Sequence, residues 1–117
     1  MSRVLFSVLC LSLLTDCRAV APKAPLSVES VPEGRATRLV LHASSGLKVN
    51  ARLAPALELG NGRVVRFHSD RLTSDSAYFA EPPFALVPDG QRPVHGTLRA
   101  SVCDSGATVC RAIVLEL

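Results

Sequence analysis

The sequence predicts a single all-β domain whose strands form a sandwich or a barrel. Short apolar and β-branched segments recur about every 8–12 residues, with turn residues between them, and this spacing is typical of such folds. No stretch shows sustained helical periodicity. The chain has 117 residues, of which 48% are apolar. One domain with its own core is therefore expected.

The first residues are expected to form an export signal that is removed. Arg3 gives a positive start, and Val4–Leu14 is an apolar run of eleven residues. A membrane-spanning helix needs about 20 such residues, so this run is too short to span and fits the apolar part of a secretory signal. We place the signal peptide at residues 1–16, a linker at 17–25 and the β domain at 26–117.

Two endings of the signal remain open. The segment from Leu14 to Cys17 resembles a bacterial lipoprotein cleavage box, in which Cys17 would be lipidated and become the first residue, although Asp16 departs from that pattern. The alternative is ordinary cleavage after Ala19 or Ala21, because Ala19–Ala21 has the A-x-A form. Contact with a membrane is expected only through a lipid on Cys17.

The domain then reads as a series of strands. Ser44–Gly46, Gly60–Gly62 and Pro88–Gly90 are turn signals, and residues 70–77 are polar and predict a loop. The strand candidates are residues 37–43, 48–53, 56–59, 63–69, 84–87, 94–103 and 109–117.

The mature domain has two cysteines. Cys10 lies in the removed segment, and Cys17 is either lipidated or cleaved away, so Cys103 and Cys110 remain. An exported protein folds in an oxidising compartment, where two such cysteines are expected to pair. A disulfide between Cys103 and Cys110 is therefore predicted.

The last two strands place this disulfide on a hairpin. Alternation puts both cysteines on faces opposite the more apolar ones, so the disulfide is expected toward the surface near the turn. Pairing Cys103 with Cys110 allows either a two-residue turn at Gly106–Ala107 or a four-residue loop from Ser105 to Thr108. The two pairings differ in Cα separation, about 5.5 Å against about 4.5 Å.

The segment from Val94 to Cys110 resembles the end of the N-terminal periplasmic domain of the thiol:disulfide interchange proteins of the DsbD type. The shared pattern is a glycine and a leucine on a strand, then a cysteine, a short loop and a second cysteine. Residues 41–59 are similar to the early segment of the same family. The resemblance runs from about residue 26 to the end of the chain.

The resemblance implies an immunoglobulin-like antiparallel β-sandwich in the periplasm or cell envelope, expected as a monomer without a cofactor. It implies that Cys103 and Cys110 are the redox pair, which passes reducing equivalents to or from a thioredoxin-like or other periplasmic redox protein. In the family an aromatic side chain can cap the disulfide. Tyr78 or Phe79 is the candidate cap here.

A second class of function stays open beside exchange. The domain could be a non-catalytic binding or structural module of the envelope, in which the disulfide only staples the surface. In the chain-entropy account, a disulfide that closes a loop of about eight residues stabilises the folded domain by only about 2.5 kcal/mol. The stabilising effect of such a staple would therefore be small. Exposure of the sulfurs and ease of reduction distinguish the two functions.

Other classes find little support in the residues. The formal net charge is +3 and the arginines are scattered, so the basic footprint of a nucleic-acid binder is missing. His42, His68 and His95 are not closely spaced with the cysteines, so no metal site is expected. The sequence has no G-x-S-x-G, H-E-x-x-H or Gly-rich phosphate loop, so hydrolytic chemistry is not expected.

Overall fold

The computed structural model describes residues 24–88, 92–106 and 109–117. These residues form eight strands and no helix, so no membrane-spanning helix occurs among them. The strands are β1 (Leu26–Glu33), β2 (Ala36–Ala43), β3 (Leu47–Val49), β4 (Ala56–Leu59), β5 (Val64–Arg66), β6 (Phe84–Val87), β7 (Gly96–Asp104) and β8 (Cys110–Glu116). The signal peptide, Cys17 and most of the linker lie outside the described residues.

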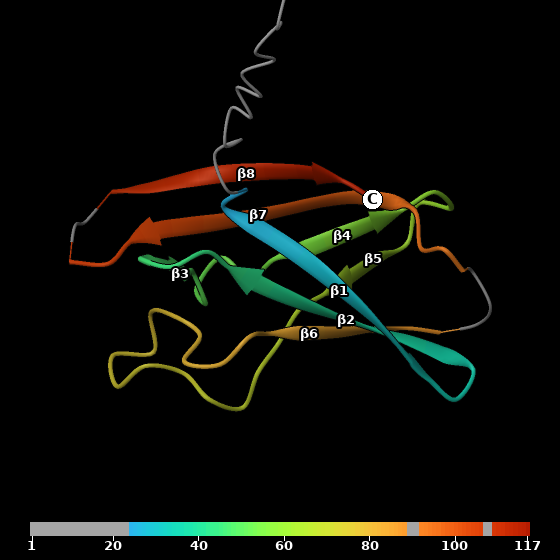
Figure 1. Cartoon of the computed structure of the whole chain (residues 1–117), viewed down its shortest axis with the longest axis horizontal. Helices are drawn as coiled ribbons and strands as arrows, with labels where there is room; N and C mark the ends of the chain where they lie inside the picture. Colours follow the sequence, from blue (N-terminus) through green and yellow to red (C-terminus); the bar gives the residue numbers. More distant parts are fainter. Residues whose placement is uncertain (1–23, 89–91, 107–108) are drawn as a thin grey trace, which may run out of the picture.

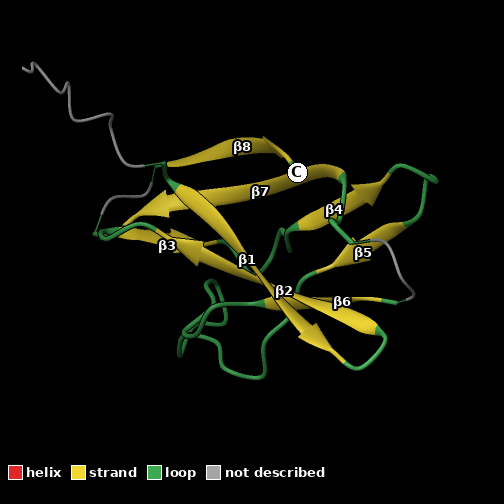
Figure 2. Ribbon diagram, turned by 45° about the vertical axis from the view of Figure 1, so that its right-hand side comes forward, coloured by secondary structure: helices red, strands yellow, loops and turns green. Residues whose placement is uncertain are grey.

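The strands form two antiparallel sheets. The small sheet has the order β1-β2-β6. The large sheet is built around β7, which pairs with β3 and β4 along one edge and with β8 along the other, while β5 pairs with β4. In Figures 1 and 2 the β1–β2 hairpin lies across the large sheet. The predicted all-β antiparallel sandwich is confirmed.

The core lies between the two sheets. Alternate residues of β2 point inward, and Leu39 and Leu41 are fully buried. Leu57 of β4 and Leu98 of β7 are buried in the same way. The core cluster contains no tryptophan or tyrosine and is built mainly of leucine, valine and alanine, as the composition predicts. Each sheet therefore presents one apolar face to the other and one polar face to solvent.

Two predicted strands are shorter than expected. Residues 48–53 were expected to form one strand, but β3 ends at Val49. The side chain of Asn50 accepts hydrogen bonds from the backbone N–H groups of Arg52 and Leu53, at 2.9 Å and 3.2 Å. A local side-chain acceptor of this kind competes with the strand ladder. Asn50 therefore turns the chain out of the large sheet.

The second short strand is β5, where residues 63–69 were expected. It ends at Arg66, because the chain then crosses to the small sheet. Phe67 donates its N–H to the carbonyl of Pro55, and His68 pairs with Phe84 of β6. Phe67 is buried in the core at this crossing. The β-like segment at residues 63–69 is thus divided between the two sheets: its first part pairs with β4 and His68 pairs with β6.

One strand was missed from the sequence. β1 (Leu26–Glu33) pairs along its whole length with β2. Most of its residues are exposed and it contains Pro32, so its composition is weakly apolar. A proline is tolerated there because, in the part of the chain that the structure describes, β1 has a neighbour on one side only.

Candidate redox site

The site is centred on the disulfide between Cys103 and Cys110, which is present as predicted. The two residues lie directly opposite each other on β7 and β8, with their Cα atoms 4.0 Å apart. Asp104 donates its N–H to the carbonyl of Val109 at 3.1 Å. Cys103 and Cys110 are therefore the non-hydrogen-bonded pair next to it. This pattern favours the four-residue connection from Ser105 to Thr108, whose residues 107–108 lie outside the described ranges.

The two cysteines differ in exposure. Both side chains lie on the outer face of the large sheet, because the neighbouring Val102 points into the core. Cys110 is on β8, at the margin of the sheet, and is exposed. Cys103 is on the central strand and has 0% exposed surface. The expectation of a surface disulfide is therefore right for Cys110 and wrong for Cys103, which neighbouring strands flank on both sides.

Lys48 is the charged residue nearest to Cys103 in the strand register. It lies on β3 directly opposite Cys103, and residues opposite each other in an antiparallel pair share a face with Cβ atoms about 4.5–5.5 Å apart. Its Nζ atom lies 5.2 Å from the centre of the Tyr78 ring. Lys48, Cys103 and Cys110 thus form one row across three strands.

Tyr78 reaches this row from the loop at residues 70–80. It pairs with Asn50, just beyond β3. The loop is held by Thr73, whose hydroxyl accepts the N–H of Tyr78 at 3.2 Å and donates to the Asp75 carboxylate at 2.6 Å. This hydroxyl, together with the N–H of Ala77, holds the pKa of Asp75 below its ordinary value. The loop is therefore a specific hydrogen-bonded structure that fixes where Tyr78 lies.

The two candidate caps point in different directions. Phe79 is partly buried and packs against the core, whereas Tyr78 is on the face that carries the disulfide. Consecutive residues of an extended chain alternate in this way. Of the two, Tyr78 is the aromatic side chain on the disulfide's side of the sheet.

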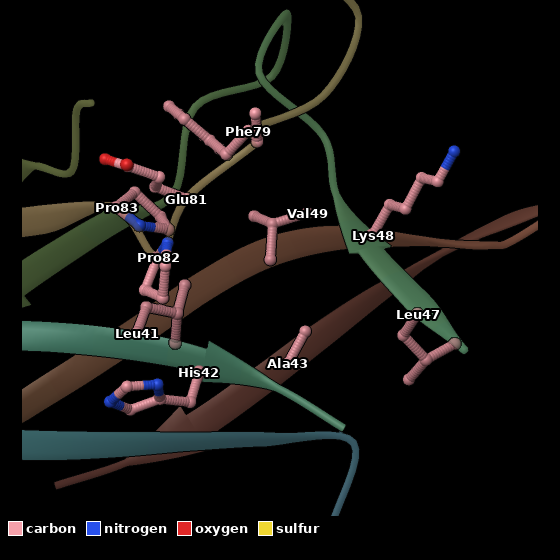
Figure 3. Close-up of a pocket in the computed structure, with 11 residues that line it drawn as sticks. Leu41, His42, Ala43, Leu47, Lys48, Val49, Phe79, Glu81, Pro82 and Pro83 are labelled. Carbon is pink, nitrogen blue, oxygen red and sulfur yellow. The ribbon is translucent and has the colours of Figure 1, made fainter. Parts of the chain in front are cut away.

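A cavity of about 190 Å³ lies on the other side of β3, between the two sheets. Leu41, Val49 and Phe79 line it, with Pro82 and Pro83 at one side. Figure 3 shows the side chains of Val49 and Lys48 leaving β3 in different directions. No buried side-chain polar atom in the described residues lacks a partner. His42, Lys48 and Glu81 also line the cavity, so it offers a ligand both polar and apolar contacts.

The three histidines lie apart. His42 contacts Glu29 at 2.8 Å, His68 stacks on Phe84 with ring centres 4.4 Å apart, and His95 lies 3.3 Å from the carbonyl of Leu117. Within residues 24–88, 92–106 and 109–117, no three His, Cys, Asp or Glu side chains are grouped to hold a metal ion.

The sequence predicts the Cys103–Cys110 disulfide, which is present, and names Tyr78 as a candidate cap, but it does not point to Lys48. The alternation of residues 48–53 places Lys48 opposite the apolar face. Its position beside Cys103, however, depends on the register between β3 and β7. The paired residues Lys48 and Cys103 are more than fifty positions apart in the chain, so no local pattern reveals the pairing.

The chain matches no protein-family model, no curated protein and no solved structure.

Proposed function

We propose that this domain is a thiol–disulfide exchange module of the cell envelope, passing reducing equivalents through Cys103 and Cys110 to or from a thioredoxin-like partner. The observation that carries the proposal is the unequal exposure of the pair. Cys110 is exposed at the sheet margin, and Cys103 is inaccessible beside it. An exposed Cys110 beside a buried Cys103 lets a partner react at one cysteine of the pair.

The chemistry starts from the oxidised pair. A thiolate of the partner attacks Cys110 Sγ, forms a mixed disulfide and releases Cys103 as a thiolate. A second thiolate of the partner then attacks the mixed disulfide at the partner's own sulfur and releases Cys110. The domain gains two electrons and two protons, and the partner becomes the disulfide. The reverse sequence oxidises the domain.

Lys48 contributes to this step through its charge. The released Cys103 thiolate lies in a site without solvent contact, where an unpaired charge is costly. An ammonium group on the adjacent strand lowers that cost. The Tyr78 ring lies against Lys48, and it thereby restricts where the lysine side chain lies.

Two further points support the proposal. The resemblance of residues 94–110 to the DsbD-type domain gives the same cysteines the same role. The predicted export signal would direct the domain to an oxidising compartment, where such exchange takes place.

Single-cysteine variants test the proposal. We expect reduced Cys103→Ser, which keeps the exposed Cys110, to attack a thioredoxin-like protein whose single cysteine is held as a disulfide with thionitrobenzoate. The thionitrobenzoate anion leaves and the two proteins are joined by a mixed disulfide. The matched Cys110→Ser variant keeps only the shielded Cys103, and we expect it to react at least tenfold more slowly while folded. Equal rates, or no reaction of either variant without denaturant, would contradict exchange through an exposed Cys110.

The burial of Cys103 also favours a second candidate function. A disulfide with one inaccessible sulfur can be a permanent staple in a binding or structural module. In that case the pair would resist reduction, with a potential below about −300 mV.

A further inference from the structure

Strand β8 has an unpaired outer edge among the described residues. It pairs with β7 only, over seven residues, and lies at the margin of the large sheet. Figure 1 shows β8 at the top of the molecule with β7 on one side of it. Free edges are templates for pairing with another chain, so this edge is a candidate docking surface.

The register shows which backbone groups face outward. Val109 and Leu117 are hydrogen-bonded to β7, through Asp104 N–H and Gly96 C=O. In an antiparallel ladder the bonded and non-bonded pairs alternate. Cys110, Ala112 and Val114 therefore direct their N–H and C=O groups away from β7. The exposed cysteine and the free hydrogen-bonding groups belong to the same residue.

A strand added at this edge would place a cysteine in bonding range of Cys110. A residue opposite Cys110 in such a ladder is a hydrogen-bonded pair, with Cα atoms about 5.5 Å apart. Disulfides form across about 4.4–6.8 Å between Cα atoms. The side chain of the added residue would also lie on the outer face, as Cys110 does. A mixed disulfide is therefore compatible with full pairing of the added strand.

The direction of attack agrees with this placement. A thiolate displaces a sulfur in line with the bond that breaks, so it must approach Cys110 from the side away from Cys103. Cys103 lies on β7, and the side away from β7 is the free edge of β8. The added strand would present its thiolate from that side.

The outer face of the large sheet carries exposed apolar side chains among its polar ones. Val114 is 57% exposed and Leu53 is 67% exposed. A shallow groove of about 230 Å³ is lined by Leu53, Ser101 and Ala112. The residue two positions from the incoming cysteine would lie against Ala112 on this face, so an apolar side chain fits there.

We infer that the free edge of β8 binds an extended, cysteine-containing segment of a periplasmic redox protein as an added strand, with its cysteine opposite Cys110 and an apolar residue two positions away. Such a protein presents its cysteine from a strand or loop, unlike a thioredoxin-like protein, whose reactive cysteine lies at the start of a helix. This inference rests on the proposed exchange function and names a second kind of partner for the same disulfide. Main-chain hydrogen bonds give the affinity in this mode of recognition, and alternate side chains give the specificity.

The test uses Ala112→Pro in the Cys103→Ser background, with Ala112→Ser as the matched control. Proline removes the outward N–H of Ala112, which makes no bond to β7, and proline is tolerated on edge strands. The probe is a peptide of alternating valine and threonine with one central cysteine, held as a disulfide with thionitrobenzoate. Cys110 attacks the peptide sulfur and releases the coloured thionitrobenzoate anion. The small disulfide of thionitrobenzoate with free cysteine is the second probe.

We expect Ala112→Pro to slow the reaction with the peptide by roughly threefold to tenfold, the effect of losing a backbone hydrogen bond. The reaction with the small probe and both reactions of Ala112→Ser should stay within about twofold. Unchanged peptide rates in Ala112→Pro would overturn the added strand while leaving exchange intact. Failure of the parent Cys103→Ser variant to react with either probe would overturn both the exchange function and this inference.

Hydrogen exchange gives a readout that does not depend on the proline variant folding. In the mixed disulfide between Cys103→Ser and the peptide, the amides of Ala112 and Val114 should become protected. The amide of Ile113 bonds to β7 in the free protein and serves as the internal control. Fast exchange of Ala112 and Val114 in the complex would overturn the inference.

Discussion

At the scale of single residues, the two cysteines have different environments although they form one bond. Cys110 is exposed, and Cys103 has no exposed surface and faces Lys48 across the strand pair. This difference comes from strand position: among the described strands, β7 has neighbours on both edges and β8 on one edge. The reactivity proposed for the pair follows from that position rather than from the cysteines alone.

Replacing Lys48 with methionine tests its part in the reaction. We expect Lys48→Met to slow reduction of the disulfide by dithiothreitol about twofold to fivefold, the range for a partly solvated charge interaction. High salt should also slow the reduction of the wild-type disulfide, because it screens the charge of the Lys48 ammonium. Arg63→Met, which removes an exposed cation between β4 and β5, is the control. A rate for Lys48→Met equal to that of Arg63→Met would exclude an electrostatic role.

The loop that carries Tyr78 should depend on pH through Asp75. The hydrogen bond from Thr73, and then that from Ala77, lowers the pKa of the Asp75 carboxyl from its ordinary value of 3.8. Its stabilisation of the loop is therefore complete above pH 3.8 and is lost as the pH falls through the lowered pKa. Amide exchange at Ala77 and Tyr78 should show weaker protection only in that acidic range. Asp75→Asn should abolish this pH dependence, and its persistence in that variant would contradict the assignment.

At the scale of elements, the close pairing of β4 and β7 depends on Gly96. A Cβ at this position would collide with the backbone carbonyl of Glu58. Gly96→Ala should therefore destabilise the domain by about 1–3 kcal/mol, the usual cost of overpacking. Gly60→Ala is the matched control, because a Cβ at Gly60 meets nothing within 4 Å. Urea unfolding of the two variants measures the difference, and equal stabilities would contradict the close approach.

The strands also show which parts of the fold could be predicted from sequence patterns. Residues 56–59, 84–87 and the last hairpin were predictable because alternation and turn residues bound them on both sides. The end of β3 was not predictable, because the side chain of Asn50 accepts hydrogen bonds from backbone amides that would otherwise pair with a neighbouring strand. The point after β5 at which the chain crosses to the small sheet was not predictable, because a β-like segment has the same sequence pattern in either sheet. Lys48 lies opposite Cys103 because of the register between β3 and β7. These strands are far apart in the sequence, and no local sequence pattern shows how they pair.

At the scale of the whole molecule, the core and the disulfide are largely separate. The core cluster lies between the sheets. The disulfide lies on the outer face of one sheet, and its cysteines are only seven positions apart in the sequence. The sandwich can therefore keep its packing when the bond opens. This separation suits a domain that alternates between oxidised and reduced forms.

Removing the bond should accordingly leave a folded domain. The double variant Cys103→Ala and Cys110→Ala should lose about 2.5 kcal/mol of stability at most from loop closure, with an unchanged dependence on urea concentration. Wild-type protein in dithiothreitol should behave in the same way. Unfolding of the double variant in buffer at 25 °C would show instead that the disulfide is required for the fold.

The reduction potential of the Cys103–Cys110 pair tests the exchange function most directly. It can be measured on the mature domain by equilibration with glutathione or dithiothreitol buffers. If the domain is an exchange module, we expect a potential in the range of exchange proteins, about −120 to −270 mV, with the disulfide opening in the folded domain without denaturant. A value below about −300 mV, or a bond that opens only when the domain unfolds, would contradict exchange and make the disulfide a structural staple.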